Sequence, residues 1–116
     1  MVSLTATLTG DGIIIQLFGG EKPHVGAVVI GLPRPSLADP AQISCNSVVV
    51  PLLGHKDDEV AKPVAERIAR LTGEPTVVIA GLHIEHAMAS EINLLKKNTF
   101  TALDKLCDVF SGILKK

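Results

Sequence analysis

The first half of the chain alternates apolar and polar residues with the period of β-strands. Residues 2–8 place Val, Leu or Ala at every second position with Ser and Thr between them, which predicts a strand with one face in water. Residues 10–12 predict a tight turn and residues 13–18 a returning strand, so these segments form a hairpin. Residues 25–32 and 43–50 are the next predicted strands, separated by a proline-rich loop.

The second half carries apolar residues at helical spacing. A first helix is predicted to begin at Asp57 or Asp58 and to end at Gly73, a left-handed cap. Residues 76–80 are typical of a short strand buried on both faces. A long last helix follows, and residues 98–101 are expected to weaken it because they are poor helix formers. The apolar faces of the two helices are Val60, Val64, Ile68 and Leu71, and Ile92, Leu95, Leu103, Leu106, Phe110 and Ile113.

The predicted order β-β-β-β-α-β-α defines an α+β fold, an α/β sandwich with a mainly antiparallel five-stranded sheet. We expect the first four strands to form an antiparallel meander, followed by one β-α-β crossover. The chain has 116 residues, enough for one hydrophobic core but not for two. Residues 1–116 are therefore interpreted as a single domain.

Composition argues against several classes of partner. The net charge is −1 and Trp and Tyr are absent, so neither electrostatic attraction nor aromatic stacking favours nucleic acid. No secretory signal or membrane-spanning apolar run is recognised, and we expect a cytoplasmic protein that does not bind membranes. Cys45 and Cys107 lie far apart in apolar segments, which predicts reduced core residues rather than a disulfide or a metal pair.

The histidines fall in loops that the predicted topology brings to one edge of the sheet. The strands at residues 13–18, 43–50 and 76–80 would point the same way, so the loops after them share that edge. Both helices begin there, and helix N-termini and glycine-rich loops expose backbone N–H groups. With Lys22 and Lys56 nearby, the edge is predicted to bind an anion such as a phosphate group. The histidines concerned are His24, His55, His83 and His86.

Two of these loop segments also have a plain structural interpretation. Residues 19–24, GGEKPH, could cradle a phosphate or form a simple β-turn, and they match neither a P-loop nor a dinucleotide fingerprint. Asp57 and Asp58 could orient the imidazole of His55, or they could only cap the helix. The motifs alone do not decide between these interpretations.

A metal centre is a further interpretation of the histidines. His83 and His86 form an isolated His-x-x-His, a spacing that is not diagnostic of a metal site in a loop. Three loop histidines with Glu85 could hold zinc or iron with an open position, which would indicate a metal-dependent hydrolase. No Ser or Cys nucleophile stands out in a recognisable motif. The residues therefore favour binding over catalysis.

Three loop segments resemble a known family. They are GGEKPHVGAV at 19–28, PLLGHKDDEVA at 51–61 and VVIAGLHIEHA at 77–87. Over roughly residues 10–95 they are similar, in order and spacing, to the small prenylated-flavin chaperone-like proteins of the LpdD type. These include the D subunit encoded with gallate-type, UbiD-like decarboxylases. The family is similar in fold to proteasome assembly chaperones.

The resemblance implies an accessory protein, not an enzyme, that binds prenylated FMN and supports its delivery to, or the assembly of, a UbiD-type decarboxylase. It implies no catalytic residue and no metal ligand, and it requires neither Glu85 nor His86. The absence of Trp and Tyr leaves little to stack on a flavin ring, so affinity would be modest or would depend on a partner. Carried over by position, the cofactor-binding residues are Gly19, Gly20, Lys22, His24, Gly26, Gly54, His55, Asp57, Gly81 and His83.

Two other functions stay open. One is a ligand-free homodimeric assembly chaperone, because a last helix of about 25 residues spans roughly 37 Å, more than a domain of this size needs. A second subunit would then cover part of its apolar face, and a homodimer is expected. The other is the metal-dependent hydrolase that uses the loop histidines.

Overall fold

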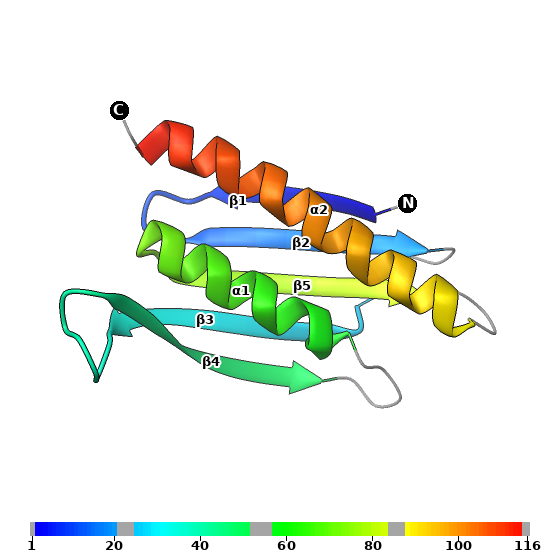
Figure 1. Ribbon diagram of the computed structural model, residues 1–116, viewed down its shortest axis with the longest axis horizontal. Helices are drawn as coiled ribbons and strands as arrows, with labels where there is room; N and C mark the ends of the chain where they lie inside the picture. Colours follow the sequence, from blue (N-terminus) through cyan, green and yellow to red (C-terminus); the bar gives the residue numbers. More distant parts are fainter. Residues whose placement is uncertain (1, 21–24, 52–56, 84–87, 115–116) are drawn as a thin grey trace.

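The computed structural model describes residues 2–20, 25–51, 57–83 and 88–114, which form a five-stranded sheet with two helices (Figure 1). The predicted order β-β-β-β-α-β-α and the α+β class are confirmed. The elements are β1 (Val2–Leu8), β2 (Ile13–Gly20), β3 (Ala27–Pro35), β4 (Ile43–Pro51), α1 (Asp58–Thr72), β5 (Thr76–His83) and α2 (Ala89–Leu114).

The order of strands in the sheet differs from the predicted meander. The order is β1-β2-β5-β3-β4, so β5 lies between β2 and β3 and separates two strands that are consecutive in the chain. β5 pairs in parallel with β2 and antiparallel with β3. β5 is the predicted strand with almost no polar residues, and the centre of the sheet is where such a strand loses most contact with water. The meander is therefore wrong, although the sheet is mainly antiparallel.

Three strands nevertheless end at one edge of the sheet, as predicted. β4 runs antiparallel to β3 and β3 antiparallel to β5, so β2, β4 and β5 all point the same way. Their last residues, Gly20, Pro51 and His83, lie at the edge where β3, α1 and α2 begin (Figure 1). We call this edge the rim. The ends of these three strands thus converge as predicted, although the order of strands in the sheet is different. The convergence depends on the direction of each strand and not on its neighbours.

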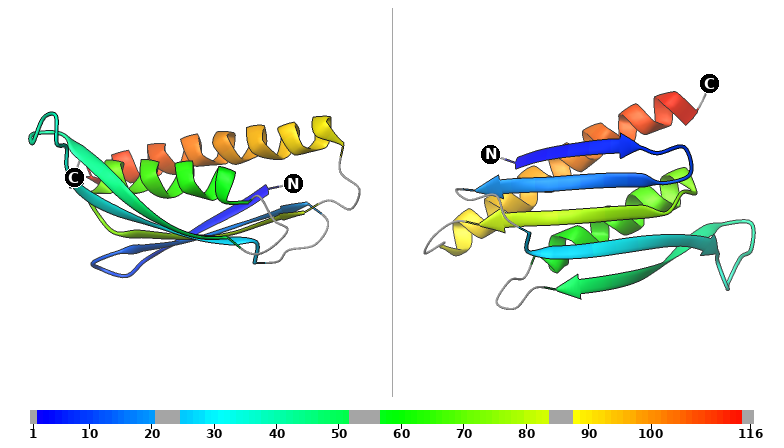
Figure 2. Two further views of the ribbon diagram at one scale, coloured as in Figure 1. Left: turned by 90° about the horizontal axis from the view of Figure 1, so that it is seen from below. Right: turned by 180° about the vertical axis from the view of Figure 1, so that it is seen from behind.

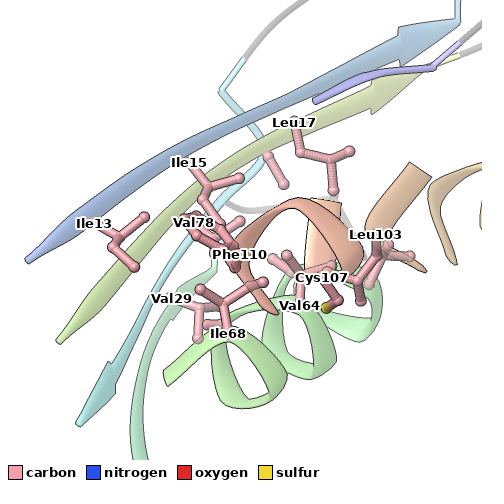
Figure 3. Close-up of a cluster of buried hydrophobic side chains, with 14 residues drawn as sticks. Ile13, Ile15, Leu17, Val29, Val64, Ile68, Val78, Leu103, Cys107 and Phe110 are labelled. Atoms are coloured by element: carbon pink, nitrogen blue, oxygen red, sulfur yellow. The ribbon is translucent and has the colours of Figure 1, made fainter. Parts of the chain in front are cut away.

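Both helices cover the same face of the sheet, which Figure 2 shows from the side. α1 packs on β3, β4 and β5, and α2 packs on β1, β2 and α1. The core between sheet and helices is mainly aliphatic, as the composition predicts (Figure 3). Alternation along β2 turns Ile13, Ile15 and Leu17 toward the helices. The other large core side chains include Val29, Val64, Ile68, Val78, Leu103 and Phe110.

α1 lies unusually close to β3. A Cβ built on Gly31 would come within 2.8 Å of the carbonyl oxygen of Ala65 and 3.2 Å of the Cβ of Ala69. Ala61, Ala65 and Ala69 are all fully buried on this side of α1. The small residues on the helix and the glycine on the strand thus set the distance between the two layers.

The predicted limits of α1 are confirmed at both ends. It begins at Asp58, and Gly73 adopts φ 69° while its N–H donates to the carbonyl of Ala69 at 2.9 Å. The predicted apolar face is wrong at two positions, since Leu71 in α1 is 36% exposed and Ile92 in α2 is 43% exposed.

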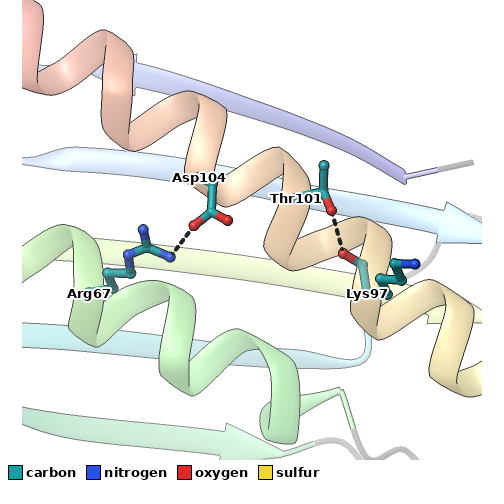
Figure 4. Close-up of polar contacts among 4 residues, drawn as sticks. All are labelled: Arg67, Lys97, Thr101 and Asp104. Carbon is teal, nitrogen blue, oxygen red and sulfur yellow. Dashed lines mark hydrogen bonds and ion pairs between the residues drawn. The ribbon is translucent and has the colours of Figure 1, made fainter.

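α2 continues through the segment that was expected to weaken it. The Thr99 hydroxyl donates to the carbonyl of Leu95 at 2.8 Å, and the Thr101 hydroxyl donates to that of Lys97 at 3.0 Å (Figure 4). Thr99 is fully buried. Tertiary packing and these hydrogen bonds outweigh the low helix propensity of the segment. No helix within the described ranges is long and apolar enough to cross a membrane.

β3 extends further than predicted, through Pro33 and Pro35. Beyond Gly31 the strand pairs with β4 only, so its other edge lacks a neighbour among the described strands. Proline has no N–H to donate, and it is tolerated where no partner strand needs one.

Both cysteines are free. Cys107 is a buried core residue, as expected, whereas Cys45 is only half-buried on the outer strand β4. Burial is the main cause that raises the pKa of each thiol. Neither thiol is therefore activated as a nucleophile.

Candidate ligand-binding rim

The structure describes about half of the predicted cofactor-binding residues. Gly19, Gly20, Gly26, Asp57 and Gly81 are all described, and all lie at the rim. His83 is placed by its backbone as the last residue of β5. Four further predicted residues lie outside the described ranges, as do Lys56, Glu85 and His86: they are Lys22, His24, Gly54 and His55.

Gly19 and Gly20 belong to β2 and do not form the predicted break. In the parallel pairing of β2 with β5, Gly19 lies beside Leu82 and Gly20 beside His83. Gly20 has φ 84°, which glycine adopts without the strain that a Cβ would bring. The turn predicted at residues 19–24 therefore cannot begin before the strand ends at Gly20.

Two more glycines bring backbone to the same place from neighbouring strands. The N–H of Gly26 donates to the carbonyl of Ala80 at 2.7 Å, which extends the pairing of β3 with β5 by one residue. Gly81 follows Ala80 in β5 and is buried. Four glycines thus lie together: Gly19 and Gly20 in β2, Gly81 in β5, and Gly26 directly before β3. Gly20 is exposed among them, and because glycine has no side chain a ligand could approach the backbone closely at this residue.

Phe18 is a rim residue that the sequence interpretation did not single out. It pairs with Gly81 across β2 and β5 and lies on the sheet face opposite the helices. The sequence contains a signal for this position. Phe18 directly precedes the two glycines, and it follows Leu17 in a predicted strand where neighbouring side chains face opposite sides. An aromatic side chain beside a cross-strand glycine also stabilises a sheet by itself.

Asp57 connects the first helix to the central strand. Its side chain makes no cap hydrogen bond in its own helix, contrary to the predicted role of its carboxylate. Instead Oδ1 accepts a hydrogen bond from the N–H of Leu82 at 3.2 Å, and Asp57 is only 7% exposed. Its backbone carbonyl accepts the N–H groups of Val60 and Ala61 at 3.1 and 2.9 Å. The start of α1 is thereby held against the end of β5.

The helix N-termini already carry negative charge of their own. Asp58 and Glu59 lie in the first turn of α1. At α2, Glu91 Oε1 accepts the N–H of Met88 at 3.1 Å. Carboxylates at these positions offset the positive end of the helix dipole. A phosphate group at the rim would therefore need cationic partners, and Lys22 and Lys56 are those that the sequence places nearest.

The described part of the rim combines backbone and apolar groups with acidic side chains at the starts of both helices. Of the four glycines Gly20 is exposed and the other three are buried, and the half-buried Phe18 offers one aromatic ring. Within the described residues no group of three or more His, Cys, Asp and Glu side chains could hold a metal ion. The side chains of all four histidines lie outside that part, so the hydrolase alternative stays a prediction.

The fold and the rim together describe an α+β protein whose candidate site lies at one edge of the sheet. The chain belongs to the family described as prenylated flavin chaperone LpdD-like domain, whose family model matches residues 1–111. The resemblance inferred from three loop segments is confirmed, and the match extends along most of α2. No curated protein matches the chain.

Proposed function

We propose that the protein binds prenylated FMN at the rim and supports delivery of this cofactor to, or assembly of, a UbiD-type decarboxylase, with no catalytic step of its own. The observation that carries the proposal is the glycine cluster next to Phe18, at the rim ends of three adjacent strands. Membership of the prenylated flavin chaperone family supports this choice of ligand.

The proposal divides the ligand between two parts of the rim. The ring system would lie against the glycine cluster and Phe18, where close approach and apolar contact are available. Lys22, His24 and His55 would bind the phosphate, because charge-assisted hydrogen bonds are the strong ones to such a group. Asp57 would act through position, holding α1 against β5. Gly54 and His83 complete the proposed set.

The phosphate part is tested by titrating the protein with prenylated FMN and with FMN, followed by gel filtration to measure the retained flavin. His24→Ala and Lys22→Ala are expected to weaken binding by about 10-fold each, the loss of one charged hydrogen bond. Lys105→Ala is the matched control, because Lys105 is exposed on α2, well beyond its first turns. Retention unchanged in both rim variants would remove the phosphate assignment.

The ring part is tested by Phe18→Leu, which keeps an apolar side chain but removes the aromatic ring. Phe100→Leu is the control, since Phe100 is 37% exposed on α2. We expect Phe18→Leu to weaken binding by about 5-fold, within the range of one aromatic stacking contact, and Phe100→Leu to leave binding unchanged. Equal binding by both variants would contradict the proposed place of the ring.

The accessory role needs a separate experiment with a partner. An apo UbiD-type decarboxylase is mixed with prenylated FMN, with and without this protein, and the flavin bound to the decarboxylase is measured over time. Faster or more complete loading that His24→Ala reduces and Lys105→Ala does not is the expected result. If the protein retains neither flavin and leaves loading unchanged, the ligand-free assembly role becomes the better hypothesis.

A further inference from the structure

β1 is an outer strand of the sheet, and its free edge lacks the usual protections against pairing. The strand pairs with β2 on one side, and no described strand pairs with it on the other. Its sequence, VSLTATL, contains no charged residue and no proline. Natural sheets normally place such residues on exposed edges, because the free N–H and C=O groups there pair readily with another strand. The unprotected edge of β1 therefore indicates a partner strand.

The even-numbered residues of β1 turn their backbone groups to this edge. The N–H of Thr9 donates to the carbonyl of Gly12 at 3.0 Å, in register with the pairing of β1 and β2. Residues of an antiparallel pair alternate between those that exchange hydrogen bonds with the partner and those that do not. The odd-numbered residues of β1 therefore bond to β2. The backbone groups that point to the free edge belong to Val2, Leu4, Ala6 and Leu8.

The pattern of polar and apolar residues in β1 is symmetric about Thr5. A second β1, paired antiparallel about this residue, would place apolar residues opposite apolar ones and hydroxyls opposite hydroxyls, on matching faces. The opposed residues would be Val2 and Leu8, Ser3 and Thr7, Leu4 and Ala6, and Thr5 with its own copy. This register uses the whole strand and forms roughly eight backbone hydrogen bonds.

β4, the other outer strand, does not have this symmetry. Its polar residues lie in the first half, and its valines follow in the second half before Pro51. Antiparallel pairing about its central residue, Ser47, would put Asn46 opposite Val48. Of the two outer strands, β1 is thus the one suited to pairing with its own copy.

The apolar side of β1 is incompletely covered within one copy of the chain. Val2, Leu4 and Ala6 contact the core but are only half-buried, and Leu8 is 56% exposed. In β2, the next strand inward, every residue that faces the helices is buried. A strand and a helix from a second copy beside β1 would complete the burial of these side chains.

α2 carries an apolar stripe above the same edge. Its C-terminal half crosses β1 and reaches past the free edge (Figure 1, Figure 2). Asp104 faces α1, where it lies 2.6 Å from Arg67 (Figure 4), so residues roughly half a turn away on the helix face the opposite side. These are Ala102 and Leu106, which are half-buried, and Val109, which is 58% exposed.

We propose that two copies of the chain pair antiparallel through β1, centred on Thr5, so that their sheets become one continuous sheet. The two-fold axis stands perpendicular to the sheet, which keeps the helices of both copies on the same face. The two α2 helices then lie antiparallel above the joined strands, with their apolar stripes in contact. The homodimer expected from the sequence thus uses α2 together with β1. The proposal does not depend on flavin binding at the rim.

Sedimentation equilibrium of the full chain without flavin, over a range of concentrations, measures the association. Ala6→Pro removes an N–H that points to the free edge and leaves the bonds between β1 and β2 in place. Ser47→Pro is the matched control, because the bond from the Ser36 N–H to the Gln42 carbonyl sets a register in which the Ser47 N–H points away from β3. Circular dichroism checks that each variant is folded.

We expect a dimer for the natural sequence and for Ser47→Pro. Ala6→Pro is expected to raise the dissociation constant at least about 10-fold, because the two-fold axis removes the same hydrogen bond twice. A natural chain that stays monomeric overturns the proposal. So does a dimer that Ala6→Pro leaves intact, or one that Ser47→Pro weakens equally.

A cysteine at the centre of the contact gives a second measurement. Thr5→Cys puts two thiols opposite each other on the axis, in a pair whose Cα atoms lie about 4.5 Å apart, which suits a disulfide. In Thr7→Cys, the control, the two thiols would be roughly 14 Å apart along the strands. The natural chain, oxidised in the same way, gives the background from Cys45 and Cys107.

We expect mild oxidation to produce a disulfide-linked dimer from Thr5→Cys, and only the background amount from Thr7→Cys. Should Ala6→Pro fail to fold, this pair of variants still decides. Equal cross-linking by the two cysteine variants, or none by Thr5→Cys, would show that β1 does not pair with its copy about Thr5.

Discussion

The carboxylate of Asp57 accepts a hydrogen bond from the backbone N–H of Leu82 at 3.2 Å, and this bond joins the start of α1 to the end of β5. The two residues are 25 positions apart in the chain. Leu82 also pairs with Gly19 of β2. One buried side chain thus fixes the first helix relative to the two strands that carry most of the glycine cluster.

Removing this carboxylate is expected to destabilise the protein. Asp57→Ala leaves the N–H of the half-buried Leu82 without this acceptor, and we expect a loss of about 1–3 kcal/mol in the free energy of unfolding. Asp57→Asn keeps an oxygen acceptor and should lose less. Urea denaturation measures both. Asp58→Ala, one residue further on, is the control and is expected to change stability by at most about 0.5 kcal/mol.

Two glycines should respond in opposite directions to alanine. Gly31→Ala brings a Cβ within 2.8 Å of the Ala65 carbonyl oxygen, which forces α1 away from β3 and is expected to cost about 1–3 kcal/mol. A Cβ on Gly112 in α2 meets nothing within 4 Å, so Gly112→Ala should stabilise by about 0.5–1 kcal/mol. Thermal melts of the two variants give the sign directly. A neutral Gly31→Ala would show that the two layers separate easily.

Stability should fall at alkaline pH in part through Cys107. Burial raises the pKa of this thiol above its ordinary value of 9.0. The folded state therefore holds the thiol proton more tightly than the unfolded state does. The resulting contribution to stability is complete below pH 9.0 and is lost as the pH rises through the folded-state pKa.

Urea denaturation at roughly pH 8, 9 and 10, a range around the ordinary pKa of a thiol, measures this dependence of stability on pH. The natural sequence should lose stability with rising pH more steeply than Cys107→Ala. Burial also raises the pKa of Cys45, so Cys45→Ala serves as the comparison for the second thiol. Identical slopes in all three proteins would contradict the argument.

The ion pair between the two helices should contribute little. Arg67 Nη1 lies 2.6 Å from Asp104 Oδ1, and the side chains are 44% and 63% exposed (Figure 4). Water and salt screen such a pair, so Asp104→Asn is expected to cost at most about 1 kcal/mol and less at high salt. Leu103→Ala, one residue earlier and fully buried, is expected to cost about 2–5 kcal/mol. A larger loss from Asp104→Asn than from Leu103→Ala would reverse this ranking.

The rim could be located from the sequence although the predicted meander is wrong, because β2, β4 and β5 share one direction in the predicted and in the observed topology. Its contents were only partly foreseen. The sequence predicts a turn at Gly19 and Gly20, since glycine pairs usually break strands. Pairing with Leu82 and His83 instead holds these two residues in β2. The sequence predicts that Asp57 caps the helix. Its hydrogen bond to Leu82 in β5 could not be predicted, because no pattern in the neighbouring residues indicates a bond to a distant strand.

The sequence by itself determined the elements, the faces of the strands and the shared direction of β2, β4 and β5. Alternation and helical spacing are local, and each segment expresses them without its neighbours. Only the tertiary structure decided that β5 enters between β2 and β3, that α1 approaches Gly31, and that an apolar sheet face is left open. These features depend on which surfaces exclude water together, and the pattern of any single segment does not contain that information.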